Sequence, residues 1–126
     1  MNQVWTGPVS DFVPTKVIYN GVLDDTEGYV GYLPSNHSIY VVFRGSESIA
    51  NWMTNLSTAK TKWTSHPECT KCQVHAGFYG SEQDVFPNVL TEVNRLRALF
   101  PTYSVKTTGH SLGAALAYLT QLDLIK

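Results

Sequence analysis

The sequence lacks several features that would assign it to particular classes of protein. It has no apolar run approaching the roughly 18 residues that a membrane-spanning helix needs. Its formal net charge is only −1, so it has no excess of basic residues with which to bind nucleic acid. Its first five residues lack the basic start and apolar stretch of a signal peptide. We therefore expect no nucleic-acid partner, no transmembrane segment and no export signal in this chain.

Internal repeats, low-complexity tracts and Gly- or Pro-rich linkers are also missing. Of the 126 residues, 43% are hydrophobic and 15% are charged, which excludes the composition of a disordered chain. A chain of this length can bury about two-thirds of its unfolded surface. We expect one continuous domain over residues 1–126.

Cysteine is scarce, and the only two, Cys69 and Cys72, lie close together. A turn that contains Pro67 and Thr70 would suit a local disulfide. Alternatively, His66, Cys69, Cys72 and His75 recur every three residues and could supply ligands to zinc, although this spacing is tight for tetrahedral coordination. Free thiols are a third possibility. The pattern alone leaves these alternatives open.

Strand-forming residues occur in four segments. Residues 16–19 and 28–33 predict two short strands separated by a polar turn. Residues 39–43 are an unbroken apolar run rich in β-branched and aromatic side chains, which predicts a central strand buried on both faces. Residues 103–108 form the fourth expected strand by composition.

Helical periodicity occurs in three segments. From Glu47 to Ser57 the apolar residues stand at i, i+3, i+4 and i+7, namely Ile49, Trp52, Met53 and Leu56. Residues 78–100 predict a longer helix, with Pro87 a candidate for a kink. Residues 114–125 predict a third helix, because Ala and Leu recur there at helical spacing. Strands and helices in this order predict an α/β fold.

Ser111 lies at the centre of Gly109-His110-Ser111-Leu112-Gly113, between a predicted strand and a predicted helix. Glycines on both sides permit the tight strand-to-helix turn that exposes a nucleophilic serine. The following helix offers a positive dipole and free N–H groups, and the N–H of Leu112 is the natural first donor to an oxyanion. Ser111 is therefore the candidate nucleophile of a serine hydrolase.

No convincing base for Ser111 is evident among the four histidines. The side chain of His110 should diverge from that of Ser111 in a sharp turn, while His37 and His66 fall in predicted loops and are expected to be solvated. Asp123 lies about three turns along the last predicted helix, too far to orient a histidine that serves Ser111.

Four stretches, taken in order, resemble the fungal lipase family, the class 3 triacylglycerol lipases and feruloyl esterases. They are Ile39-Tyr40-Val41-Val42-Phe43-Arg44-Gly45-Ser46, Asn51-Trp52-Met53-Thr54-Asn55-Leu56, Cys69-Thr70-Lys71-Cys72-Gln73-Val74-His75-Ala76-Gly77-Phe78 and Thr108-Gly109-His110-Ser111-Leu112-Gly113-Ala114. The resemblance covers most of residues 28–120. It implies an α/β-hydrolase fold of the fungal-lipase type.

The resemblance also implies roles for individual residues. Ser111 would be the nucleophile, and Ser46 and Leu112 would form the oxyanion hole. The apolar residues Ile49, Trp52, Met53 and Leu56 would belong to a lid that covers the serine in water and turns outward onto lipid. From periodicity alone, a core-facing helix was the simpler interpretation of that segment. The resemblance favours a Cys69–Cys72 disulfide over zinc, and implies no metal and no cofactor.

The family places its catalytic Asp and His well downstream of the nucleophile, and only residues 112–126 follow Ser111 here. We therefore expect this chain to be the N-terminal part of the domain, with the C-terminal half of the same domain as its missing partner and little activity alone. The parent would be a secreted carboxylic ester hydrolase, most simply a triacylglycerol lipase acting at a lipid–water interface, with phospholipids and hydroxycinnamoyl esters as alternative substrates. Two N-x-S sequons, at Asn36 and Asn55, are weakly consistent with secretion. The alternatives are a non-catalytic lipase-like protein that binds lipid or protein, and a small zinc-stabilised module.

Overall fold

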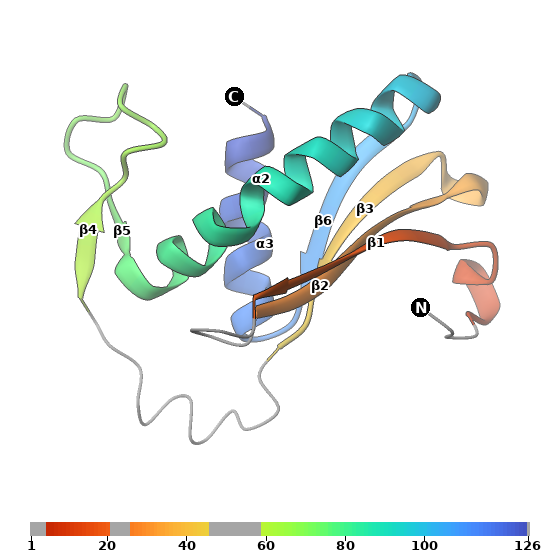
Figure 1. Cartoon of the computed structure of the whole chain (residues 1–126), viewed down its shortest axis with the longest axis horizontal. Coiled ribbons are helices and arrows are strands. Elements are labelled where there is room, and N and C mark those ends of the chain that lie inside the picture. Colours follow the sequence, from red (N-terminus) through yellow and green to blue (C-terminus); the bar gives the residue numbers. More distant parts are fainter. Residues whose placement is uncertain (1–4, 21–25, 46–58, 126) are drawn as a thin grey trace.

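The structure is a computed structural model that describes residues 5–20, 26–45 and 59–125. Its strands are β1 (Val13–Asn20), β2 (Thr26–Leu33), β3 (Ser38–Phe43), β4 (Lys60–Lys62), β5 (Gln73–His75) and β6 (Ser104–Gly109). Its helices are α2 (Ala76–Leu99) and α3 (Leu112–Leu124), with short 3-10 turns at Gly7–Val9 and Pro34–Asn36. Figure 1 shows the two helices crossing beside the main sheet. The predicted helix at 47–57 lies outside the described residues.

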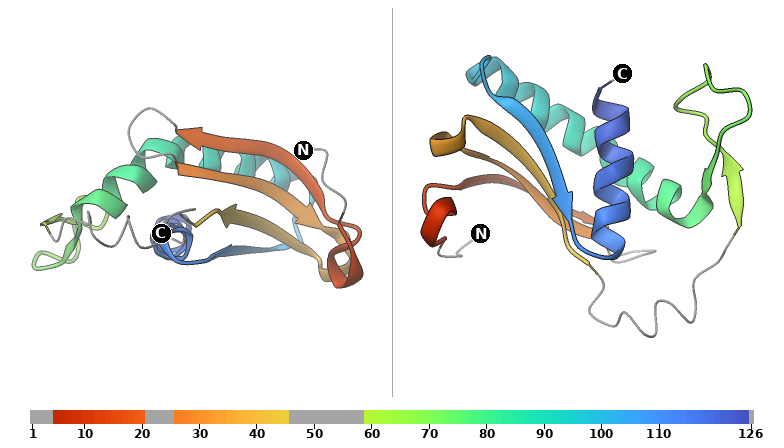
Figure 2. Two further views of the ribbon diagram at one scale, coloured as in Figure 1. Left: turned by 90° about the horizontal axis from the view of Figure 1, so that it is seen from below. Right: turned by 180° about the vertical axis from the view of Figure 1, so that it is seen from behind.

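The main sheet is mixed and has the strand order β1-β2-β3-β6. Strands β1, β2 and β3 are antiparallel neighbours, whereas β3 and β6 run parallel with Phe43 opposite Gly109. The parallel pair is joined through α2, as parallel neighbours require a crossover. The left view of Figure 2 shows the four strands side by side in this order. Because β3 and β6 are parallel, their carboxyl ends lie side by side at the same end of the sheet, and α3 begins just after the end of β6.

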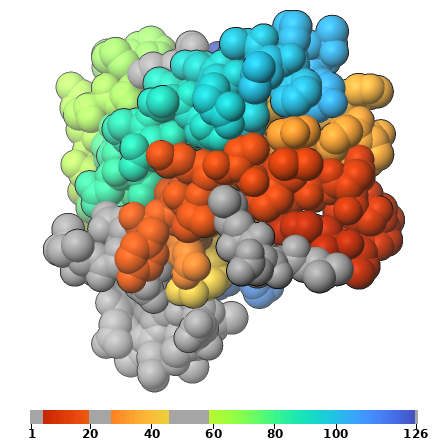
Figure 3. Space-filling model, turned by 45° about the vertical axis from the view of Figure 1, so that its right-hand side comes forward, coloured from red at the N-terminus to blue at the C-terminus, as the bar shows by residue number. Residues whose placement is uncertain are grey.

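One face of the sheet and one side of each helix form the core. Along β3 the side chains of Ile39, Val41 and Phe43 are at most 2% exposed. They pack with Val85, Val89, Val93 and Leu96 of α2 and with Leu116 and Ala117 of α3. The surface of α2 lies directly against β1 (Figure 3). Hydrophobic burial at this interface therefore fixes where both helices sit on the sheet.

The expectation that β3 is buried on both faces was wrong. Tyr40 and Val42 alternate with the core residues, point to the opposite face and stay partly exposed. An uninterrupted apolar run predicted two buried faces. The core residues of α2 and α3 pack on the face of β3 that carries Ile39, Val41 and Phe43, so the opposite face of the strand is less buried.

A second, two-stranded sheet pairs β4 with β5. It was not expected from the sequence, because the three residues of β4 are all exposed and carry no apolar alternation. The hairpin precedes α2, and the N–H of Ala76 donates to the carbonyl of Ala59 at 2.9 Å. This hydrogen bond joins the residue before β4 to the first residue of α2.

Candidate active site

Ser111 connects β6 to α3 in an uncommon backbone conformation. Its φ is 58° and its ψ is −123°, and it is the N-terminal flanking residue of α3. Positive φ is rare for a residue with a β-carbon and costs conformational energy, so it is kept where surrounding structure imposes it. A strained turn of this kind, from strand to helix, is the geometry expected of a nucleophile elbow.

Two glycines make this turn possible. A β-carbon on Gly109 would lie 2.3 Å from the carbonyl oxygen of Gly113, and one on Gly113 would lie 2.4 Å from the carbonyl oxygen of Phe43. Real β-carbons do not approach backbone atoms so closely. The structure thus confirms the crowding between strand and helix that the sequence predicted at these positions.

Backbone groups dominate the surroundings of Ser111. The N–H of Gly113 donates to the carbonyl of His110 at 3.0 Å, and the N–H of Ala114 donates to the carbonyl of Ser111 at 3.0 Å. Leu112 is the first residue of α3, where N–H groups have no partner within the helix. The half-buried Ser111 side chain therefore lies at the N-terminus of α3, where the helix dipole stabilises negative charge.

The end of β3 reaches the same turn. A β-carbon on Gly45 would lie 2.6 Å from the carbonyl oxygen of His110 and 3.6 Å from the β-carbon of Ser111. The structure therefore brings the residue that precedes Ser46 against the turn. Ser46 itself, like the lid candidates Ile49, Trp52, Met53 and Leu56, lies outside the described residues, so these assignments stay predictions.

The histidines are placed as follows. His110 is exposed, and His75 accepts a hydrogen bond at Nδ1 from the N–H of Phe78 at 3.2 Å, which caps α2. The expectation that His66 is solvated was wrong, since it is only 8% exposed. Its ring nitrogens lie 3.0 Å from Asp123 Oδ1 and 3.0 Å from Glu68 Oε1. His66 thus joins the loop between β4 and β5 to α3.

Asp123 is the centre of a buried polar network that sequence reasoning missed. Besides His66, it accepts hydrogen bonds from Ser65 Oγ at 3.0 Å and from Gln83 Nε2 at 2.9 Å. Glu82 on α2 is fully buried next to it. Burial, with a contribution from the neighbouring Asp123 carboxylate, raises the pKa of Glu82 to about 8. A pKa of about 8 keeps Glu82 protonated at neutral pH, so that no second negative charge lies beside Asp123.

Comparisons with known proteins find lipases over most of this chain. The family model for Lipase (class 3) matches residues 40–126. A lipase of Rhizomucor miehei is 38% identical over 106 residues, which are 84% of this chain and 28% of that protein. A secreted mono- and diacylglycerol lipase 2 of Gibberella zeae is 35% identical over 94% of this chain and 33% of its own length.

A solved triacylglycerol lipase, described as having a catalytic centre formed by a serine protease triad, superimposes with a TM-score of 0.83 at 36% identity. The match covers 91% of this chain and 42% of that one. The chain belongs to the class 3 lipase family. The fold is accordingly the α/β-hydrolase fold of the fungal lipases, and the chain spans about a third of the length of the curated relatives it matches.

This class 3 lipase chain contains a disulfide between Cys69 and Cys72, with α-carbons 5.4 Å apart. It closes a short turn inside the loop that carries His66. The zinc alternative needed both sulfurs as thiolates and two free imidazoles. The sulfurs are bonded to each other, and His66 and His75 hold the partners described above.

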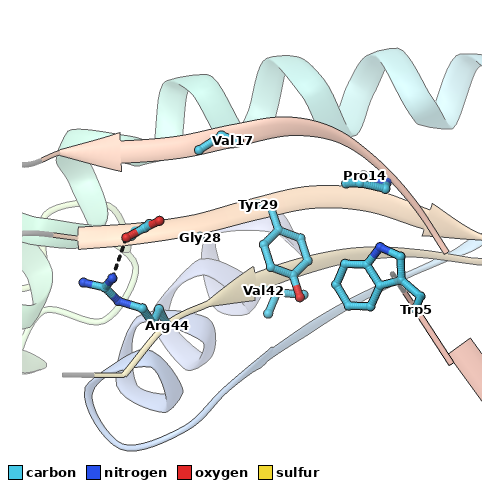
Figure 4. Close-up of a pocket in the computed structure, with 8 residues that line it drawn as sticks. Trp5, Pro14, Val17, Gly28, Tyr29, Val42 and Arg44 are labelled. Carbon is cyan, nitrogen blue, oxygen red and sulfur yellow. Dashed lines mark ion pairs between the residues drawn. The ribbon is translucent and has the colours of Figure 1, made fainter. Parts of the chain in front are cut away.

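The outer face of the lipase sheet carries a pocket of about 370 Å³. Its apolar floor includes Val17, Tyr29 and Val42, and at one end the guanidinium of Arg44 pairs with the carboxylate of Glu27 (Figure 4). Arg44 directly precedes Gly45, so this end of the pocket adjoins the Ser111 turn. Across residues 5–20, 26–45 and 59–125, no helix has both the length and the apolar character needed to cross a membrane.

Proposed function

We propose that the protein to which this chain belongs is a carboxylic ester hydrolase in which Ser111 is the nucleophile. The observation that carries the proposal is the positive φ of Ser111 at a strand-to-helix turn crowded on both sides by glycine. A serine held in this way has its hydroxyl directed away from the sheet edge and beside a helix N-terminus. Membership of the class 3 lipase family supports the same assignment.

The reaction divides ester cleavage into two steps. Ser111 Oγ attacks the ester carbonyl carbon while a general base takes its proton, and the carbonyl oxygen becomes an oxyanion. The N–H of Leu112, and by the family resemblance that of Ser46, would donate to this oxyanion. The intermediate collapses, and the alcohol leaves with the proton. Water then attacks the acyl-enzyme, releases the carboxylic acid and restores Ser111. The steps need no cofactor.

A serine triad also needs a histidine and a carboxylate, and we assign neither to residues of this chain. His66 and Asp123 form a pair, but Asp123 lies roughly 18 Å along α3 from Ser111. His75 is occupied as the cap of α2. A base contributed from outside residues 1–126 is consistent with the greater length of the relatives.

Acylglycerols are the proposed substrates. The Gibberella zeae relative is named for mono- and diacylglycerols, and the solved structure described above is a triacylglycerol lipase. We extend this substrate class to the present protein, with the segment containing Ile49, Trp52, Met53 and Leu56 as its proposed lid. Secretion is proposed as well, since a relative is named as secreted and the Cys69–Cys72 disulfide suits an oxidising compartment.

Covalent labelling tests the proposal. A fluorophosphonate should modify the intact protein at Ser111, located by peptide mass spectrometry, and the Ser111→Ala variant should lose both labelling and hydrolysis of a short p-nitrophenyl ester. The neighbouring His110→Ala variant serves as a control for the fold of the turn and should still be labelled. Label on another residue, or undiminished turnover by Ser111→Ala, would refute the nucleophile. An intact protein without label or turnover would instead be a non-catalytic member of the family.

A further inference from the structure

The residues that end β3 lie against the Ser111 turn with backbone atoms in close approach. Gly113 is packed so closely that an added β-carbon would lie 2.4 Å from the carbonyl oxygen of Phe43 and 2.9 Å from that of Arg44. Gly45 is packed in the same manner against the carbonyl oxygen of His110. Main-chain atoms of the two segments thus approach each other closely at Gly113 and at Gly45. A displacement of the end of β3 is therefore passed directly to the residues flanking Ser111.

Two bonds between Arg44 and Glu27 hold the end of β3. The main-chain N–H of Arg44 donates to the carbonyl of Glu27 at 2.8 Å, which continues the β2–β3 ladder one residue beyond Phe43. Arg44 Nη1 also lies 2.6 Å from Glu27 Oε2. Both bonds anchor Arg44 to β2, and the next residue is Gly45. The ion pair thus lies at the end of β3 (Figure 4), directly before Gly45.

The position of this pair is more informative than its strength. The two side chains are 39% and 41% exposed, and ion pairs with this much solvent contact contribute little to the stability of a fold. Main-chain placement is different, because a displacement of an oxyanion donor by a fraction of an ångström has large effects on rate. A weak but directional contact is sufficient to select one position of the strand end.

We infer that Arg44 and Glu27 are positioning residues for the active site: their paired contact fixes Gly45 against His110 and so aligns the chain leading into Ser46 with Ser111. The inference rests on the proposed function, in which Ser46 donates to the oxyanion. Neither residue touches the reacting atoms. Their effect passes through the backbone of Gly45 and is therefore an effect on kcat rather than on substrate affinity.

The test uses the intact protein, a soluble short-chain p-nitrophenyl ester and fluorophosphonate titration of the active serine, so that kcat is expressed per labelled Ser111. Arg44→Gln should lower kcat about tenfold and change KM less than about twofold, because an oxyanion donor is displaced rather than removed. Glu27→Gln should lower kcat about threefold. Arg44→Lys keeps the charge without the planar guanidinium and should fall between Arg44→Gln and the wild type. The double variant Glu27→Arg/Arg44→Glu should recover part of the lost kcat.

A second ion pair supplies a control elsewhere in the fold. Arg95 Nη2 lies 2.7 Å from Glu92 Oε2 on α2, and the side chains of Arg95 and Glu92 are 52% and 8% exposed. Arg95→Gln removes an ion pair that does not involve the end of β3, and it should leave kcat per labelled serine unchanged even though Glu92 is more buried than Glu27.

The inference is overturned if kcat of Arg44→Gln stays within twofold of the wild type, or if Arg95→Gln lowers kcat equally. A rise in KM alone would also overturn it, and would assign Arg44 to substrate binding. Wild-type protein that carries no label on Ser111 refutes the proposed function and, with it, this inference. Labelled wild type with unaffected variants refutes the positioning role alone.

Discussion

The two ends of helix α3 are held in place by different means. At the N-terminal end, Gly113 packs against Phe43 of β3 and Gly109 of β6 so closely that neither glycine has room for a β-carbon. At the C-terminal end, Asp123 is tied by the side chains of Ser65, His66 and Gln83, from a loop and from α2. The first end is defined by steric exclusion and the second by satisfied polar groups. The contrast predicts that the two ends respond to different kinds of change.

Gly113→Ala should have the largest effect, because its β-carbon would lie 2.4 Å from a backbone oxygen that cannot rotate away. We expect a loss of about 4 kcal/mol in the free energy of unfolding, together with loss of serine reactivity, since the turn must shift. Chemical denaturation and fluorophosphonate labelling measure the two effects.

Gly80→Ala is the matched control for this change. Gly80 lies inside α2, and a β-carbon there meets nothing within 4 Å. Alanine should therefore stabilise the protein by about 0.5 to 1 kcal/mol through helix propensity. If Gly113→Ala were as well tolerated as Gly80→Ala, steric exclusion would not be what defines the Ser111 end of α3.

Asp123→Ala tests the opposite end of α3. Removal of the carboxylate takes away the acceptor of the buried His66 and of the partly buried Ser65 and Gln83, and we expect a loss of about 3 kcal/mol in unfolding free energy. Ser111 lies at the other end of the helix, so the labelling rate of the folded protein should change little.

Glu68→Gln is the control on the same imidazole. Glu68 lies 3.0 Å from His66 Nδ1, as Asp123 lies 3.0 Å from Nε2, but the Glu68 side chain is 70% exposed and that of Asp123 is 3% exposed. Solvent screens the exposed contact, so Glu68→Gln should cost less than about 0.5 kcal/mol. Equal losses for Asp123→Ala and Glu68→Gln would show that burial does not set the strength of this network.

The same contrast explains how much of the molecule the sequence predicts. The Ser111 turn is a local pattern of five residues. Its glycines are required because strand and helix leave no room for β-carbons there, so both the position of the turn and its crowding could be predicted. The periodicity of α2 and α3 and the composition of β1, β2, β3 and β6 likewise follow from neighbouring residues. The structure moves their boundaries by only a few residues.

The network around Asp123 has no such local signal. His66 and Asp123 are 57 positions apart, and a loop histidine looks solvated until the fold places a buried carboxylate beside it. The hairpin β4–β5 was missed because Lys60–Lys62 are polar and exposed and show no alternation of apolar and polar residues. They form a strand because they pair with β5. Contacts of this kind depend on tertiary structure that propensity does not contain.

Glu82→Gln tests how the stability of the polar network at the C-terminal end of α3 depends on pH. In the unfolded chain Glu82 loses its proton near its ordinary pKa of 4.5, whereas the folded protein keeps it up to about 8. Between these values the folded state binds more protons, so the stability contributed by protonated Glu82 is complete below pH 4.5 and is lost as the pH rises through 8. Glutamine resembles the protonated acid in shape and cannot ionise.

We therefore expect the wild type to lose on the order of 2 kcal/mol more than Glu82→Gln between pH 5 and pH 9, with relaxation around the new charge recovering part of the full penalty. Unfolding by urea across this range measures the difference. Glu92→Gln tests the specificity of the effect, because its hydrogen bonds from Arg95 lower the pKa of Glu92 and hold it ionised throughout this range. Parallel stability curves for wild type and Glu82→Gln would show that the pKa of Glu82 is the same in the folded and unfolded states, so that Glu82 is ionised in the folded protein, contrary to this expectation.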